Sequence, residues 1–158
     1  MPKTYEYTVE LPLEPAALFR LLIDSERWRH SKLYGEIRWM EGEPWQPGAT
    51  REVETLLSYR RKHRQRVLAR RENELLELVS HGFGYTNHVQ LELRPAPGGG
   101  TTLRIVNLVE GFLPLIFGNL DSFMTQIVQA WIEETRRLCA EEQSTQRSAV
   151  SRPCDESA

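Results

Sequence analysis

The sequence LPLIFGNLDSFMTQIVQAWIEETRRL at residues 113–138 carries apolar side chains at steps of three and four residues. That period is typical of a helix with one buried face, here about seven turns long. Pro114 stands in the first turn, where a helix tolerates proline. We therefore predict a helix over residues 114–141 that needs a large apolar partner surface. Its apolar stripe consists of Leu113, Ile116, Phe117, Leu120, Met124, Ile127, Trp131 and Leu138.

The residues before this helix mostly alternate between apolar and polar, which indicates strands. Two short helices interrupt the alternation. One follows Pro15, and the other follows the capping residue Asp24 and runs through Trp28. The predicted strands are residues 5–11, a segment around 37–39, and then 50–57, 61–71, 74–81, 85–94 and 101–110.

One strand, two short helices, a meander of strands and a long last helix predict an α+β domain. The chain resembles the START-like or SRPBCC superfamily, which includes polyketide cyclases and has the helix-grip fold. The resemblance covers about residues 3–141 and rests on LEPAALF at 13–19, DSERW at 24–28, WQPGAT at 45–50 and LCAE at 138–141. It implies a curved antiparallel sheet of about seven strands, wrapped around the long helix and enclosing a ligand cavity. We assign residues 1–141 to this domain and predict a disordered polar tail at 142–158.

Composition limits the class of protein. The net charge is -2, and no apolar run reaches the ~18 residues that span a bilayer. We expect a soluble, cytoplasmic protein without membrane insertion, and a homodimer is compatible with the sequence. Cys139 and Cys154 have no partners at metal-ligand spacing, so we expect no metal and no cofactor.

Seven basic residues and no acidic ones lie between positions 59 and 71. Strand alternation places Arg64, Arg66 and Arg70 outside, beside the outward Glu52, Glu54 and Glu77. This predicts a solvated ladder of opposite charges. Nucleic-acid binding is disfavoured because only Tyr59 could stack on a base. Docking of an acidic partner or an anionic head group stays open, as does an interaction module like that of co-chaperones with a similar fold.

The same alternation turns four polar side chains inward: His63, Gln65, Asn87 and Asn107. Buried polar groups need hydrogen bonds, so four of them on one sheet suggest a wet cavity. His63 is either a general acid or base or a satisfied structural histidine. The two asparagines either orient a ligand's carbonyl or hydroxyl group or pair with neighbouring side chains.

The resemblance to polyketide cyclases implies that Trp28 and Tyr34 line the pocket mouth. In those cyclases an arginine on a central strand also helps fold the substrate, whereas the inward positions here carry His63 and Gln65 and no clear arginine. We predict binding of a polyketide, lipid, isoprenoid or aromatic compound. The alternative is a cyclase or dehydratase in which His63 and Tyr34 are catalytic. The predicted ligand-binding residues are Tyr7, Trp28, Tyr34, Trp39, Gln65, Tyr85, Asn87, Asn107, Met124, Ile127 and Trp131.

Overall fold

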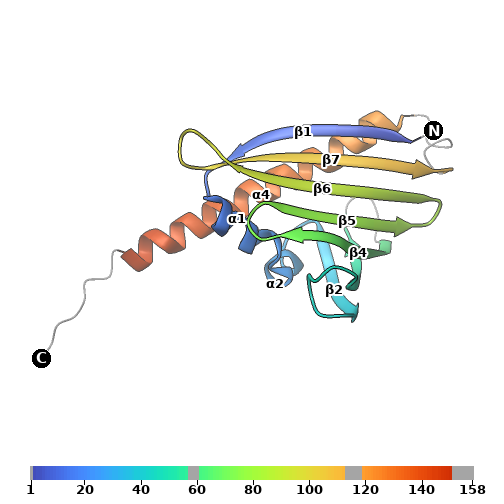
Figure 1. Ribbon diagram of the computed structural model, residues 1–158, viewed down its shortest axis with the longest axis horizontal. Coiled ribbons are helices and arrows are strands. Elements are labelled where there is room, and N and C mark those ends of the chain that lie inside the picture. The colour runs from blue at the N-terminus through green and yellow to red at the C-terminus, as the bar shows by residue number, and fades with distance from the viewer. Residues whose placement is uncertain (1, 57–60, 113–118, 151–158) are drawn as a thin grey trace, which may run out of the picture.

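The computed structural model describes residues 2–56, 61–112 and 119–150. Its seven strands form one antiparallel sheet in the order β1-β7-β6-β5-β4-β3-β2. Each strand therefore lies beside its neighbour in sequence, except that β1 joins β7 (Figure 1). The strands are β1 (Lys3–Leu11), β2 (Tyr34–Glu41), β3 (Thr50–Thr55), β4 (Arg61–Arg71), β5 (Leu75–Gly82), β6 (Tyr85–Pro95) and β7 (Thr101–Gly111).

Three helices accompany the sheet in the described residues. Pro15 begins α1 (Pro15–Leu22), where its missing N–H costs nothing. The Asp24 side chain accepts a hydrogen bond from the Arg27 amide at 3.2 Å and caps α2 (Ser25–Arg29). The long helix α4 (Leu120–Val150) crosses one face of the sheet (Figure 1). The predicted α+β architecture is confirmed.

The core lies between the face of the sheet that looks toward α4, here called the inner face, and the helices. Alternate residues of β7 are buried on the inner face, with Leu103 fully buried. From α1, Leu18 and Phe19 enter the same core. The closest backbone contacts of α4 are with β1 and α1.

The C-terminal end of α4 differs from the prediction. Residues 142–150 are helical, so the predicted disordered tail is wrong as far as Val150. The segment 144–150 is exposed and has little to pack against. However, it contains no glycine or proline, and extending an existing helix costs far less than starting one. Residues 151–158 lie outside the described part of the chain, as do Leu113, Ile116 and Phe117 of the predicted stripe.

A β-bulge in β4 corrects the predicted position of Arg70. Val67 pairs with Leu78 and Ala69 pairs with Glu77, so Leu68 is an extra residue that reverses the alternation after it. Arg70 consequently faces inward, with its guanidinium 5.4 Å from the centre of the Phe19 ring. Its carboxylate partner is Glu72, at 2.8 Å.

Apart from Arg70, part of the predicted ladder of opposite charges is present on the outer face of the sheet. Arg64 lies opposite Glu52 in the register of β3 and β4. The ion pairs of Glu52 are instead with Lys62 at 3.8 Å and Arg38 at 3.7 Å. Glu77 contacts His88 at 2.6 Å on β6. Tyr59 and the side chain of Arg61 lie outside the described residues.

Within the described residues, no helix is both long and apolar enough to cross a membrane.

Candidate functional site

Five polar side chains cross the inner face on five adjacent strands, and we call them the polar row. They are Arg51, Gln65, Ser80, Asn87 and Asn107. In the sheet register Arg51 lies opposite Gln65, Gln65 opposite Ser80, and Ser80 opposite Asn87. Arg51 Nε donates to Gln65 Oε1 at 2.9 Å, and Gln65 Nε2 donates to Ser80 Oγ at 3.1 Å. Strand pairing thus joins residues distant in sequence into one hydrogen-bonded chain.

The far end of the polar row is incompletely bonded. Asn87 Nδ2 donates to Asn107 Oδ1 at 3.1 Å. This leaves Asn87 Oδ1 and Asn107 Nδ2 buried without a partner among the described residues. An unpaired buried polar atom costs ~1–3 kcal/mol. The pair therefore leaves one acceptor and one donor without a partner, on two adjacent strands.

The other end of the polar row is an arginine that the sequence analysis missed. Arg51 is 8 % exposed and faces inward, so the expectation of no inward arginine is wrong. The sequence carries a signal for it, since Arg51 has the same strand parity as Val53, which is fully buried. Its Nη1 donates to Ser25 Oγ at 3.3 Å. Its guanidinium carbon lies 4.3 Å from the centre of the Trp45 ring and 5.6 Å from that of Trp39.

Burial sets the charge state of the groups around Arg51. Burial lowers the pKa of Arg51 to about 10, opposed by Tyr34, so the guanidinium remains charged at neutral pH. Burial and then the charge of Arg51 lower the pKa of His63 to about 4, so the imidazole is neutral. Burial raises the pKa of Tyr34, against opposing effects of Arg51 and the Trp131 indole. The site therefore combines one cation with a neutral imidazole and a neutral phenol.

Aromatic side chains from three elements form one wall of the interior. Trp28 on α2 stacks on Trp131 of α4, with ring centres 5.7 Å apart and planes 5° apart. The Tyr34 ring meets the edge of Trp28 at 5.8 Å and 73°. The Trp28 indole N–H donates to the Leu21 carbonyl at 3.0 Å, which fixes the orientation of the stack. Trp39 packs with Trp45 instead, at 5.3 Å and 71°.

The remaining predicted site residues occupy separate parts of the interior. The hydroxyl of Tyr7 lies 3.4 Å from Thr125 Oγ1, linking β1 to α4. Met124 is 5 % exposed, whereas Ile127 is only half-buried on the same helix. Tyr85 is half-buried at the start of β6. The structure thus brings Tyr34, His63 and Gln65 around Arg51, and holds Asn87 and Asn107 together at the other end of the polar row.

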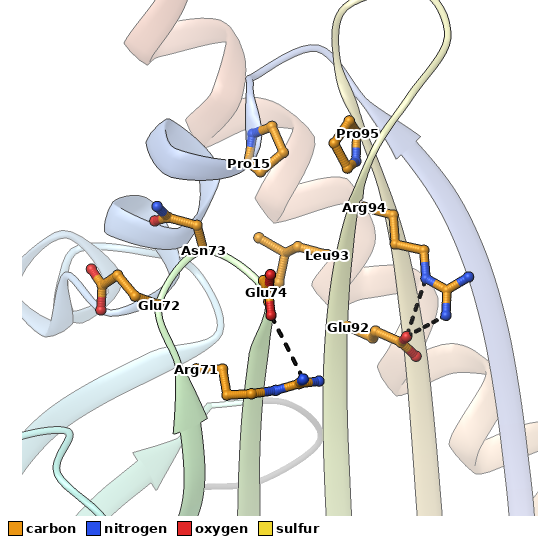
Figure 2. Close-up of a pocket in the computed structure, with 9 residues that line it drawn as sticks. All are labelled: Pro15, Arg71, Glu72, Asn73, Glu74, Glu92, Leu93, Arg94 and Pro95. Atoms are coloured by element: carbon orange, nitrogen blue, oxygen red, sulfur yellow. Dashed lines mark hydrogen bonds and ion pairs between the residues drawn. The ribbon is translucent and has the colours of Figure 1, made fainter.

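Two hollows lie away from the polar row. A hollow of about 470 Å³ is lined by Pro15, residues 71–74 and residues 92–95 (Figure 2). A second, of about 390 Å³, lies near Pro12 and Gln143. Each charged side chain that lines the first hollow has a partner: Arg71 pairs with Glu74 at 3.7 Å, Arg94 with Glu92 at 2.6 Å, and Glu72 with Arg70 outside the hollow at 2.8 Å.

The described residues provide neither a cluster of metal ligands nor an ionised thiol. No group of three or more histidine, cysteine, aspartate or glutamate side chains there is arranged to hold a metal ion. Cys139 is buried on α4, and burial raises the pKa of its thiol to about 11. Such a thiol is not a nucleophile at neutral pH. Cys154 lies outside the described residues.

Comparison with known proteins connects this architecture to solved structures only. No protein-family model and no curated protein matches the chain. The crystal structure of Ara h 8.0201 matches with a TM-score of 0.74 at 15 % identity, covering 89 % of this chain and 99 % of that one. A Chromobacterium violaceum protein matches with a TM-score of 0.63 at 20 % identity, covering 86 % of this chain and 96 % of that one.

A Thalictrum norcoclaurine synthase point mutant, solved in complex with a transition-state analogue, is also similar. Its TM-score is 0.68 at 8 % identity, covering 90 % of this chain and 97 % of that one. The predicted helix-grip fold is thereby confirmed. At these identities the likeness extends to the fold and not to a shared activity.

Proposed function

We propose that this protein binds a small, mostly apolar molecule between the inner face of the sheet and α4. The observation that carries the proposal is the Asn87–Asn107 pair, with its buried, unpaired acceptor and donor. Such atoms are rare in folded proteins because each one costs stability. A ligand hydroxyl that displaced the side chains covering these atoms would satisfy both, by donating to Asn87 Oδ1 and accepting from Asn107 Nδ2.

The surroundings of the pair favour an apolar ligand body. Val89 lies opposite Asn107 on the inner face, and Leu91 and Ile105 follow along the same two strands. Several inward side chains are only half-buried, namely Tyr34, His63, Asn87, Val89 and Trp131. The inner face therefore keeps accessible surface that a small molecule can cover. The norcoclaurine synthase complex supports the proposal to the extent that this fold accommodates an organic ligand.

Catalysis by His63 and Tyr34 stays a prediction. A pKa of about 4 leaves His63 able to accept a hydrogen bond but without an acid proton at neutral pH. The raised pKa of Tyr34 keeps its phenol protonated and able to donate. These states suit the orientation of a ligand oxygen better than proton exchange. An interaction surface at the exposed Arg64 and Arg66 also stays a prediction.

Binding is tested by fluorescence titration with N-phenyl-1-naphthylamine, a neutral apolar dye that brightens when it leaves water. The variant Val89→Phe enlarges a side chain on the inner face, next to the asparagine pair. The control Val106→Phe makes the same change on the outer face of β7. We expect the wild type to bind the dye saturably. Val89→Phe should weaken this binding by about tenfold or more, because losing one apolar contact with the dye costs ~1–3 kcal/mol of binding free energy. Val106→Phe should leave the affinity unchanged.

Two results would contradict the proposal: no saturable binding by the wild type, or equal effects of the two phenylalanine substitutions. Native mass spectrometry of protein purified without organic solvent provides an independent readout. A small molecule that co-purifies with the wild type and is lost from Val89→Phe would support the same site.

A further inference from the structure

We propose that the molecule bound on the inner face carries an organic anion, a carboxylate, and that Arg51 pairs with it. This inference rests on the proposed function and names the class of ligand. Arg51 is the charged end of the polar row, 8 % exposed and fixed from two sides by Gln65 and Ser25. A buried charge needs an opposite charge to offset its lost hydration.

No such charge is supplied by the described residues. The hydrogen-bond acceptors of Arg51 are a side-chain amide oxygen and a hydroxyl, both neutral. Its neighbour Glu52 lies on the outer face and pairs with Lys62 and Arg38. The two titratable side chains that interact with Arg51, His63 and Tyr34, are neutral at pH 7. Arg51 is therefore a cation among neutral partners.

Other partly buried arginines of the chain show how unusual this is. Arg27 pairs with Glu142 at 2.7 Å, and Arg70 pairs with Glu72 at 2.8 Å. Arg70 is the most informative comparison, because it also faces inward and also lies over an aromatic ring, that of Phe19. The two inward arginines thus differ mainly in whether a carboxylate of the chain neutralises them.

The guanidinium also has donors to spare. Nε and Nη1 are engaged by Gln65 and Ser25, whereas no described residue accepts a hydrogen bond from Nη2. The guanidinium carbon lies over the rings of Trp45 and Trp39, so aromatic faces and not carboxylates contact this group. An arginine edge with free N–H groups matches the two oxygens of a carboxylate.

The two ends of the polar row set the layout of the ligand. Arg51 and Asn87 are three strand spacings apart, which corresponds to ~14 Å at about 4.8 Å per spacing. A carboxylate at Arg51 and a hydroxyl at the asparagine pair would therefore belong to an elongated molecule. A straight chain of about twelve carbon atoms has the corresponding length, at ~1.25 Å per carbon when extended, and serves as the probe.

The test compares dodecanoate with dodecan-1-ol by titration calorimetry, at concentrations below those at which either amphiphile aggregates. We expect the wild type to prefer dodecanoate by about tenfold or more, the range of one charge-assisted hydrogen bond. Arg51→Gln should lose that preference, so that the ratio of the two affinities falls toward one. Arg51→Lys should keep part of it, because the charge remains. The matched control Arg70→Gln removes an inward arginine that is already paired and should keep the full preference.

The outcomes separate the two proposals. If the wild type binds both probes equally, or if Arg51→Gln retains the preference, the anion inference is wrong while ligand binding stands. If the wild type binds neither probe, the proposed function fails and the inference fails with it. The comparison of the two probes on the wild type needs no variant, so a misfolded Arg51→Gln would not leave the question open.

Discussion

Acidification should destabilise this protein through His63. The imidazole is half-buried on β4, opposite Val53, and close enough to Arg51 to feel its charge. Protonation in the folded state would place a second cation beside the first in a poorly hydrated region. In the unfolded chain the same imidazole is hydrated, with a pKa near ~6.5. The unfolded state therefore takes up the proton first as the pH falls.

The size of the effect follows from the two pKa values. The folded pKa of about 4 is depressed, so the stabilising contribution is present above ~6.5 and is lost as the pH falls toward 4. A single group with these values loses ~2 kcal/mol of stability between pH 7 and pH 5, and ~3 kcal/mol by pH 4. Most of this loss precedes the titration of ordinary carboxylates, whose pKa values lie near ~4.

The measurement is urea unfolding at pH 7 and pH 5, followed by tryptophan fluorescence, for the wild type and for His63→Gln. Glutamine is polar and similar in size but does not titrate. We expect the wild type to lose ~2 kcal/mol more than the variant over this interval. Because both proteins share all other titrating groups, their difference isolates His63. A difference below ~0.5 kcal/mol would refute the account of His63 as a desolvated neutral imidazole.

Three further predictions concern the asparagine pair, the buried thiol and the end of α4. Asn107→Leu leaves both polar atoms of the Asn87 side chain unpaired and should cost ~1–3 kcal/mol, whereas Asn87→Leu with Asn107→Leu removes all four polar atoms and should restore part of that stability in urea unfolding. In a Cys154→Ser background, Cys139 should react with dithionitrobenzoate at pH 8 only after unfolding, because a pKa of about 11 leaves about a thousandth of the thiol ionised. Deletion of residues 144–158 should change the free energy of unfolding by less than ~0.5 kcal/mol, because residues 144–150 are exposed, while circular dichroism shows a loss of helix.

Each of these has a contrary outcome. A double leucine variant less stable than Asn107→Leu would mean that the asparagine pair stabilises the fold as it stands. Rapid labelling of the native thiol would contradict the burial of Cys139. For the deletion, a cut that also removes Glu142 is the matched comparison, because it breaks the ion pair with Arg27 at 2.7 Å. If the shorter deletion were the more harmful, the exposed turns would have an unrecognised contact.

The fold could be predicted because it depends on periodicity over long segments. Alternation along β7 identified Leu103, Ile105 and Val109 as inward, and all three are buried. The same rule places Arg51 inside, because it stands two residues from Val53 on the same strand. The contacts that stabilise Arg51 in the interior are with Gln65, Ser25 and Trp45. These residues come from three other segments of the chain, so the pattern of one strand cannot predict them.

Two local features escaped the pattern for physical reasons. The bulge at Leu68 inserts one residue into β4 with no glycine or proline to mark it, so Arg70 was placed on the wrong face. The end of α4 was placed too early because apolar periodicity ends near residue 139, whereas the helix continues to Val150 through exposed residues. Apolar periodicity marks only the buried part of a helix, so it does not indicate helical turns that are exposed.

The polar row spans positions 51 to 107, and its hydrogen bonds link Arg51 to Gln65, Gln65 to Ser80, and Asn87 to Asn107. Substitutions along it should consequently show epistasis, with effects on binding that do not add between neighbours such as Arg51 and Gln65. A lineage that exchanged one member would be under pressure to exchange the adjoining strand's residue as well. Specificity in this scaffold would then evolve by concerted change at dispersed positions, and the recognition surface could not be transplanted as a single peptide segment.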